Sequence, residues 1–456
     1  MQPMLGLIRI YSFKDKQSGV ALLVLMIIIA MATTAAIYSK YNSKTMAIDR
    51  DKKTTIALSK AKEALIYFSL RDGYLNPVPT PCGSLTNCPR PGDLPCPDRT
   101  NDGLAELSCG SSAGSNQAFR LNRLPWRDLG LGDLTDGYGE RLWYAVSNNY
   151  KNNTRTRPLN SDTVGTITVR NSAGRVIYDA TTGGGVVAVI FSAGNAITRQ
   201  DGVAQSRTGI GVNVSNNYLD NANGEDNANF IDINQNGFIS GPVKDVAGNL
   251  ILNDRMIVIT RDEMAAAMET YVLTQVRREL LAYYNNAFYY PYPALFNDVS
   301  CIVGIGVNIN AGCDSVAANY EGRIPVSNID QAGADWPNPP ASSTSILKGL
   351  RDSNWFQQNL WRELIYYAIS PDCEIAMPNC TGVTQRLTLS NALTMPINNK
   401  DAIVVATGRP IGGQTRVAKT MTLNYLEADN ISPADFVYGR ATQVSNAFND
   451  RAMSIP

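Results

Sequence analysis

The N-terminal part of the chain begins with polar and basic residues and then becomes strongly apolar. Residues 17–39 form a stretch of 23 without a charged side chain, and residues 20–37 are almost entirely apolar. As a helix, 23 residues extend about 34 Å, enough to cross the roughly 30 Å hydrocarbon core of a membrane. Arg9, Lys14 and Lys16 precede this stretch. The positive-inside rule therefore predicts one membrane span, a cytoplasmic N-terminus and export of everything after it.

A second, amphipathic helix is predicted to continue the first without a break. Residues 40–71 contain neither Pro nor Gly. Their apolar positions are Ile48, Ile56, Leu58, Ala61, Leu65 and Phe68. This pattern predicts a helix with one face toward a core, ending near Gly73 and Pro77.

The second half of the chain carries its own helix signal. Thr260 is followed three residues later by Glu263, which is the pattern of a capping box at a helix start. Apolar residues then recur at every fourth position: Met264, Met268, Val272, Val276, Leu280 and Tyr284. The spacing places them on one face of a helix.

Short apolar segments bounded by turn residues predict strands in both halves. They are residues 164–169, 175–178, 186–191, 387–389 and 403–407. A helix laid on an antiparallel sheet in each half corresponds to an α+β fold class.

The exported part contains an apparent internal duplication. Six short segments of the first half recur in the same order in the second half, at offsets of roughly 200 to 220 residues. The pairs are 63–67 with 279–283, 123–125 with 323–325, 144–147 with 367–370, 186–190 with 402–405, 217–220 with 424–427, and 253–255 with 449–451. Chance similarity in a chain rich in Gly, Asn and Ala is the alternative. The duplication predicts two tandem units with one plan.

Composition and charge exclude several classes of function. Lys+Arg and Asp+Glu both number 40, so no overall basic field indicates nucleic acid as a partner. The chain has no histidine, which removes Ser-His and Cys-His catalytic pairs and His-ligated zinc. Neither a complete dinucleotide-binding glycine motif nor a phosphate-binding P-loop occurs. We therefore expect that the protein is not an enzyme.

The chain has eight cysteines, all of them after the apolar stretch. They are Cys82, Cys88, Cys96, Cys109, Cys301, Cys313, Cys373 and Cys380. An even number in an exported segment predicts four disulfides, and the short spacings favour pairing between neighbours along the chain. A zinc site is the alternative, although no C-x-x-C pair is present.

One loop has the spacing of a calcium site, and calcium is the only candidate cofactor. Oxygen-bearing side chains stand at positions 1, 3, 5 and 9 of this loop: Asp98, Thr100, Asp102 and Glu106. Gly103 occupies position 6, where calcium loops turn sharply. Position 12 is Cys109 rather than the glutamate of an EF-hand. Solvated Asn/Asp turns are the alternative.

A second loop has a similar spacing. Asp232, Asn234 and Asn236 stand at positions 1, 3 and 5, and Gly237 follows at position 6. Position 12 is Val243, and the second half of the chain has no counterpart of this loop.

The residues around the start of the apolar stretch suggest a family. The polar leader ends in Lys16-Gln17-Ser18-Gly19, and the apolar run starts at Val20. This junction resembles the prepilin signature of type IV pilins and type II secretion pseudopilins. The resemblance implies cleavage after Gly19 and N-methylation of Val20 by a prepilin peptidase. Two alternatives remain: an uncleaved signal anchor, and a signal peptide cleaved after residues 30–32.

Two further positions bear on this resemblance. Most pilins have glutamate as the fifth mature residue, where this chain has Val24, a loss that minor subunits at the fibre tip share. Residues 136–144 resemble the segment that opens the sheet of major pseudopilins. The residue types of that segment predict an aspartate–glycine turn that leads into a strand.

The resemblance implies an organisation and a function for the whole chain. Residues 1–19 are then a leader, residues 20–75 a pilin-like membrane-spanning and amphipathic helix, and residues 76–259 and 260–456 two pilin-like lobes. The implied function is a minor pilin or pseudopilin subunit at or near a fibre tip, for assembly initiation or adhesion. Its implied partners are other pilins or pseudopilins, the prepilin peptidase, an inner-membrane assembly platform and the membrane. The expected location is the inner membrane, with one span and a periplasmic C-terminal domain. The alternative is an anchored periplasmic binding protein or adhesin that does not polymerise.

Overall fold

The computed structural model describes most of the chain after residue 17. The described residues are 18–75, 90–110, 117–153, 155, 157–209, 213–230, 237–302, 313–325, 355–382, 384–391, 394–431, 435–441, 445 and 447–456. Burial of side chains is described for the same residues except 18–22, 35–43, 72–75, 117, 118, 286, 357, 391 and 394.

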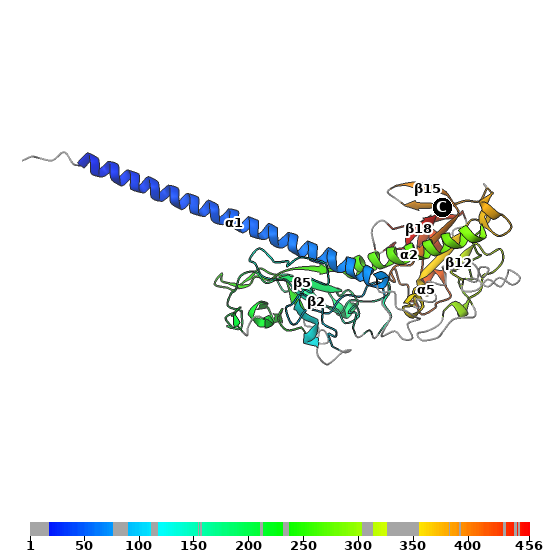
Figure 1. Cartoon of the computed structure of the whole chain (residues 1–456), viewed down its shortest axis with the longest axis horizontal. Helices are drawn as coiled ribbons and strands as arrows, with labels where there is room; N and C mark the ends of the chain where they lie inside the picture. The colour runs from blue at the N-terminus through cyan, green and yellow to red at the C-terminus, as the bar shows by residue number, and fades with distance from the viewer. Residues whose placement is uncertain are drawn as a thin grey trace, which may run out of the picture.

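A single long helix extends from a head that is built around two four-stranded sheets (Figure 1). Helix α1 (Ser18–Leu75) has 58 residues and is about 87 Å long. Its C-terminal part lies on the first sheet, and α2 (Arg261–Ala287) begins beside its end. We call residues 90–259 the first lobe and residues 261–456 the second lobe. The lobes follow one another along the long axis of the molecule, so the second lobe lies farthest from the free end of α1.

Each lobe is built on a four-stranded antiparallel sheet. The first has the order β1-β2-β5-β11, and the second has the order β12-β13-β16-β18. The strands of the first sheet are β1 (Leu121–Arg123), β2 (Trp143–Val146), β5 (Ala188–Ser192) and β11 (Arg255–Ile259). Those of the second are β12 (Glu321–Arg323), β13 (Ile365–Ile369), β16 (Ala402–Ala406) and β18 (Arg451–Ile455). In both sheets the chain starts at one edge and ends at the other.

Smaller elements surround the two sheets. Further strands are β3 (Val169–Arg170), β4 (Val176–Tyr178), β6 (Asn221–Ala222), β7 (Glu225–Asp226), β8 (Phe238–Ile239), β9 (Val243–Lys244), β10 (Leu250–Leu252), β14 (Leu387–Asn391), β15 (Thr394–Lys400) and β17 (Val437–Gly439). Short helices are α4 (Trp355–Gln358) and α5 (Trp361–Leu364), with 3-10 turns at Gln117–Arg120, Ala180–Thr182, Ser215–Asn217, Val299–Cys301, Pro371–Cys373, Pro378–Cys380, Thr422–Asn424 and Ala428–Ile431. The fold is therefore mixed α/β, with mostly sheets and few helices.

The core joins the helices to the sheets. Leu58, Ala61 and Leu65 of α1 are buried, and the predicted residues of α2 from Met264 to Leu280 are buried as well. The predicted capping box is confirmed, because Thr260 Oγ1 accepts from Glu263 N while the Glu263 carboxylate accepts from Thr260 N.

One predicted helix face and one predicted strand differ from the structure. Ile48 and Ile56 of α1 are 66% and 45% exposed, because the head begins to cover the helix only near Thr54. The predicted strand at residues 164–169 consists mostly of isolated bridges, and only Val169 belongs to a strand there.

The fold-class prediction of a long membrane-spanning N-terminal helix is wrong. In the part of the chain that the structure describes, no helix is long and apolar enough to cross a membrane. The predicted single-pass, inner-membrane location is contradicted by the same finding.

A buried pair of carboxyl groups fastens the last strand of the first sheet. Asp254, immediately before β11, accepts hydrogen bonds through Oδ2 from Asp220 N at 2.8 Å and from Asn227 Nδ2 at 2.9 Å. Asp220 Oδ2 accepts from Asn253 N at 2.8 Å. Burial, the main cause, raises the pKa of Asp220 to about 6 and that of Asp254 well above its usual range.

The second lobe repeats this arrangement. Asp450, immediately before β18, accepts through Oδ2 from Glu427 N and Asn430 Nδ2, both at 3.0 Å. Glu427 Oε2 accepts in turn from Asn449 N at 3.0 Å. The segments involved are those that match in the sequence, residues 217–220 with 424–427 and 253–255 with 449–451.

The two lobes are joined by a fully buried asparagine. Asn359 Oδ1 accepts from Leu159 N at 2.9 Å and from Arg90 Nη1 at 3.3 Å, and its backbone carbonyl accepts from Asn160 Nδ2 at 2.8 Å. Its own Nδ2 donates to Trp355 O. Buried polar groups with this many partners hold two surfaces in one register.

The carboxyl pair makes stability depend on pH. The pKa values of Asp220 and Asp254 are raised in the folded state. Their contribution to the free energy of unfolding is therefore fully present below about pH 4 and is lost as pH rises through about 6 and beyond. Asp254→Asn keeps the acceptor for Asp220 N and removes the charge. We expect it to raise the free energy of unfolding at pH 7.5 by about 1–3 kcal/mol and to flatten its pH dependence.

Urea titrations between pH 4 and pH 8 measure this effect. The matched control is the exposed Asp429→Asn, for which we expect a change within about 0.5 kcal/mol. A less stable Asp254→Asn at pH 7.5 would show that the charge of Asp254 does not destabilise the folded protein and would contradict this prediction.

Candidate functional site

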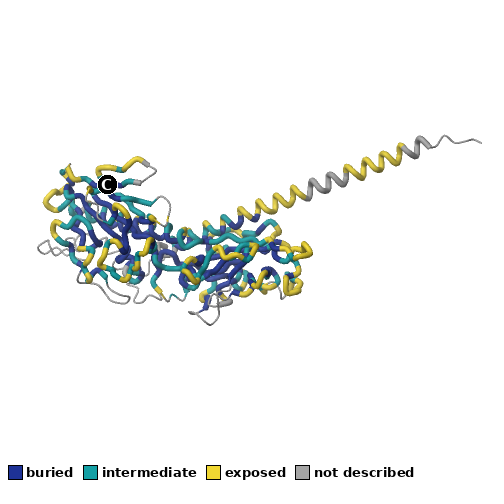
Figure 2. Tube along the Cα trace, turned by 180° about the vertical axis from the view of Figure 1, so that it is seen from behind, coloured by how far each residue is buried: buried dark blue, intermediate teal, exposed yellow. Residues whose placement is uncertain are grey.

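The outer part of α1 carries a continuous run of exposed apolar side chains. Figure 2 shows its described residues as exposed, on a helix that leaves a head in which the buried segments are concentrated. Its exposed large apolar side chains are Leu23, Val24, Leu25, Met26, Ile27, Ile28, Ile29 and Met31. They lie on all sides of the helix, since they follow one another almost without interruption. A helix that is apolar all round is normally covered by other structure.

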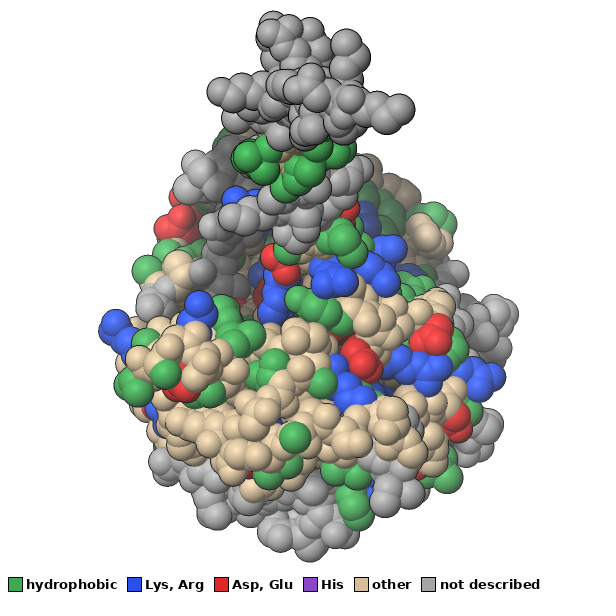
Figure 3. Space-filling view, turned by 90° about the vertical axis from the view of Figure 1, so that its left-hand side faces the viewer, with side chains coloured by type: hydrophobic (Ala, Val, Ile, Leu, Met, Phe, Trp, Pro, Cys, Tyr) green, Lys and Arg blue, Asp and Glu red, His purple; other side chains and the backbone are tan. Residues whose placement is uncertain are grey.

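A charged segment separates this apolar surface from the head. The exposed residues here are Asp49, Arg50, Asp51, Lys52 and Lys53. Figure 3, which views the molecule from the stalk side, shows hydrophobic side chains on the helix above a head surface where Lys, Arg, Asp and Glu are mixed. The head therefore presents no single-sign field on this side.

Side-chain contacts hold α1 against the first lobe and against the start of α2. Arg255 of β11 forms an ion pair with Asp51, with 3.1 Å between Nη1 and Oδ1, and donates through Nη2 to Thr55 Oγ1 at 3.0 Å. The Arg50 guanidinium lies 5.2 Å from the centre of the Tyr138 ring. Farther along, Lys62 pairs with Glu263 of α2 at 2.5 Å.

The predicted turn at residues 136–144 brings its backbone close to that of α1. Asp136 is buried and accepts through Oδ1 from Tyr138 N and Glu140 N, and through Oδ2 from Ser192 Oγ at 2.7 Å. The turn brings Gly137 N within 3.0 Å of Thr54 Oγ1. A Cβ at position 137 would lie 2.2 Å from the backbone oxygen of Arg50. Only glycine allows this approach.

The residues of the predicted processing site belong to α1. Gly19 and Val20 are in its first turns, and their side chains lie outside the residues whose burial is described. Val24 is described and is 48% exposed. The cleavage and methylation assignments stay predictions.

Three of the predicted local disulfides are present. They join Cys96 to Cys109, Cys301 to Cys313, and Cys373 to Cys380. Cys82 and Cys88 lie outside the described residues. Pairing between neighbouring cysteines is therefore confirmed for these three pairs.

The first predicted calcium loop is organised by its own hydrogen bonds. Asp98 is buried, and it accepts from Asn101 N through Oδ1 at 2.6 Å and from Gly103 N through Oδ2 at 2.7 Å. Asp102 Oδ1 accepts from Leu104 N, so its carboxylate also serves the turn.

The other predicted ligands of that loop point to different partners. The Glu106 carboxylate accepts from Arg99 N at 3.1 Å and lies 3.6 Å from the Arg99 guanidinium. Thr100 Oγ1 donates to Asp98 Oδ1 at 3.3 Å. Asp232, Asn234 and Asn236 of the second candidate loop lie outside the described residues.

Comparison with known proteins finds no match: no family profile, no curated protein and no solved structure resembles the chain significantly.

The sequence did not point to a cavity that lies between the two lobes. Its charged lining residues are Arg157 and Asp162 from the first lobe and Glu363, Arg416 and Lys419 from the second. Residues 157, 162, 363, 416 and 419 lie in no strand of the four-stranded sheets and follow no shared spacing, so only the fold brings them together.

The contact at Gly137 gives a test of how α1 is held. Gly137→Ala places a methyl group against the α1 backbone, and we expect it to lower the free energy of unfolding by about 1–3 kcal/mol. It should also speed tryptic cleavage at Lys52 and Lys53, because α1 must move away from the head.

Gly132→Ala is the matched control, since nothing lies within 4 Å of the added methyl. Equal stability and equal protease resistance of the two variants would show that α1 is not held by this turn.

Proposed function

We propose that the protein is a structural subunit of a pilin- or pseudopilin-like fibre, placed at or near the fibre tip and processed after Gly19. The observation that carries this proposal is the exposed apolar part of α1, from Leu23 to Met31, on a helix that leaves the head. Helices of neighbouring subunits would cover it. Burial of each large side chain contributes about 1.5–3 kcal/mol.

The size of the head supports a position of the subunit at the fibre tip. Residues 76–456, which follow α1, amount to 381 residues. A head of this size leaves little room for neighbours that stack closely along a shaft. Two lobes aligned along the axis of α1 extend the subunit forward, which suits an end position.

The residue at position 24 supports the same place. A carboxylate there would serve a shaft subunit by pairing with the N-terminal amine of the next subunit. Val24 offers no such group, and it is one of a continuous row of apolar side chains. A subunit with nothing above it needs no such pair.

The second candidate is a binding protein or adhesin that does not polymerise. The cavity between the lobes favours it, because a purely architectural head has no need of a charged cavity. The two candidates differ in the fate of the leader and in whether the protein enters fibres.

Processing at Gly19 gives the first test. We expect the mature chain to begin at Val20, and Gly19→Val to leave the precursor at full length, since the peptidase must bring the scissile backbone close to its catalytic groups. N-terminal mass spectrometry of the protein from cells with and without prepilin peptidase measures this.

Gly6→Val, also in the leader, is the control and should be processed normally. A mature N-terminus at Thr33 would show a signal peptide instead. A wild-type protein that keeps residues 1–19 in cells with prepilin peptidase would contradict the proposal.

Position 24 tests the place in the fibre. In a tip subunit, Val24→Glu buries a carboxylate that has no amine to pair with, and such an unpaired charge costs several kcal/mol. We expect at least a fivefold decrease of the variant in sheared fibres, whereas the control Val24→Ile should enter fibres normally. More Val24→Glu protein than wild type in the fibres would show a shaft subunit.

A further inference from the structure

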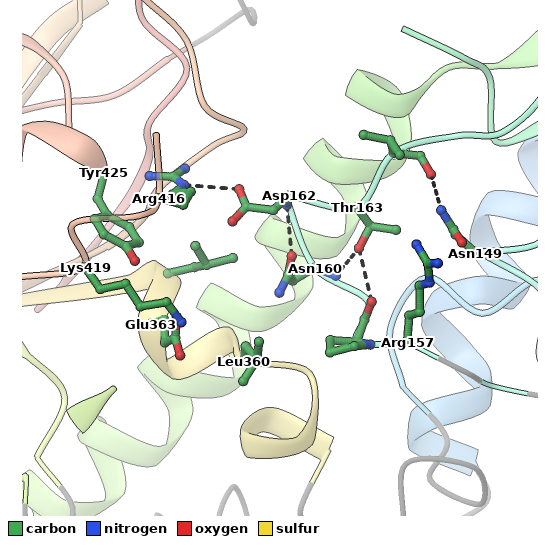
Figure 4. Close-up of a pocket in the computed structure, with 13 residues that line it drawn as sticks. Asn149, Arg157, Asn160, Asp162, Thr163, Leu360, Glu363, Arg416, Lys419 and Tyr425 are labelled. Carbon is green, nitrogen blue, oxygen red and sulfur yellow. Dashed lines mark hydrogen bonds and ion pairs between the residues drawn. The ribbon is translucent and has the colours of Figure 1, made fainter. Parts of the chain in front are cut away.

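The cavity between the lobes has a volume of about 340 Å³ and walls from both of them (Figure 4). The first lobe contributes a loop around Asn160 and Asp162, and the second contributes α5 and the segment from Arg416 to Tyr425. Figure 4 shows Arg157 at one end, Lys419 and Glu363 at the other, and Asn160 and Asp162 between them. The volume lies at the lower end of the roughly 300–1,000 Å³ of small-molecule sites.

A buried tyrosine hydroxyl without a partner lies in the wall. Tyr425 is 1% exposed, and its hydroxyl has no hydrogen-bond partner among the residues described. Its ring is held between two guanidinium groups, Arg416 at 4.5 Å and Arg323 at 5.3 Å from the ring centre. Burial raises the pKa of Tyr425 to about 12, so the hydroxyl is a neutral donor at physiological pH.

A buried carboxylate oxygen without a partner lies nearby. Glu363 pairs through Oε2 with Lys419 Nζ at 2.7 Å, while its Oε1 is buried and has no partner among the described residues. Arg323 fixes both residues, because it donates to the backbone oxygens of Glu363 at 2.8 Å and Lys419 at 2.7 Å. The wall is therefore formed before any ligand arrives.

The charges of the lining leave an excess of one positive charge. Arg416 pairs with Asp162 at 3.2 Å, and Lys419 pairs with Glu363. Arg157 has no acidic partner in the described part of the chain. The excess positive charge thus lies at the end opposite Glu363.

We propose that this cavity binds a hydroxylated organic monoanion of the sugar-acid class. Its carboxylate would lie toward Arg157, and its hydroxyl groups would reach Tyr425 and Glu363. A hydroxyl group satisfies both buried atoms, since it accepts from the Tyr425 hydroxyl and donates to Glu363 Oε1. The site uses no part of the outer helix and does not depend on the proposed fibre function.

Other classes of ligand fit the lining less well. Inorganic phosphate or sulfate offers little to donate to Glu363 Oε1 and would lie against two carboxylates. A neutral sugar leaves the charge of Arg157 unmatched, and a zwitterion, which has no net charge, leaves the excess positive charge of the lining uncompensated. A cation meets three basic side chains in the same cavity.

Isothermal titration of the full chain tests the proposal with three probes: D-glucuronate, D-glucose and inorganic phosphate. We expect saturable binding of glucuronate, with at least tenfold weaker binding of the other two. A disaccharide that carries one uronate distinguishes a free sugar acid from a residue within a glycan, and binding of either one supports the site.

Two variants locate the site. Tyr425→Phe keeps the ring between the guanidinium groups and should weaken glucuronate binding about tenfold through the lost hydrogen bond. Its melting temperature should stay equal or rise, because the hydroxyl is buried without a partner in the free protein. Arg157→Gln should reduce the affinity for glucuronate to that for glucose.

The control is Tyr218→Phe, the corresponding tyrosine of the first lobe, whose ring lies between Arg123 at 4.0 Å and Arg207 at 4.9 Å. It should leave binding unchanged. The proposal is overturned by absence of glucuronate binding at millimolar concentration, by equal affinity for glucose, or by Tyr425→Phe and Tyr218→Phe having the same effect.

Discussion

The buried carboxyl group that precedes the last strand of each sheet is the interaction on which both lobes depend. Asp254 and Asp450 each accept from a backbone amide of a distant loop and from a buried asparagine. These bonds tie the edge strand to the loop that covers the sheet. Two ionised carboxylates in this place would repel, and burial together with the neighbouring carboxylate raises the pKa of Asp254 and of Asp450 well above its usual range.

This constraint explains which parts of the chain matched in the sequence. Asp220, Asn253 and Asp254 form the carboxyl network of the first lobe, and the matched residues Glu427, Asn449 and Asp450 form that of the second. These matched positions therefore make the same hydrogen bonds in both lobes. What the sequence did not reveal was that the two segments meet, since the residues they join are 34 apart in one lobe and 23 in the other. The strand orders of the sheets and the cavity between them depend on such distant contacts.

Features that depend on residues close in sequence were predicted more reliably than features that depend on longer segments or distant contacts. The capping box at Thr260 and three neighbouring cysteine pairs were predicted correctly, because each depends on residues close in sequence. Strands of two or three residues show no periodicity and were mostly missed. The apolar N-terminal run led to a wrong prediction of a membrane span among the described helices. Hydropathy alone also does not predict that the side chains of Ile48 and Ile56 are exposed. Their exposure depends on where the turn at Gly137 contacts α1.

Asn359 has a mechanical consequence. Helix α1 is fastened to the first lobe through Arg255 and Gly137, and its Lys62 pairs with Glu263 at the start of the second lobe. Tension between the far end of the second lobe and α1 passes along the backbone from β11 into α2 and through the junction of Leu159, Asn160 and Arg90 with Asn359. The bonds of this junction are buried and lie close together, so they share the load. The head would then transmit a pull as one stiff body up to a threshold force and yield abruptly above it.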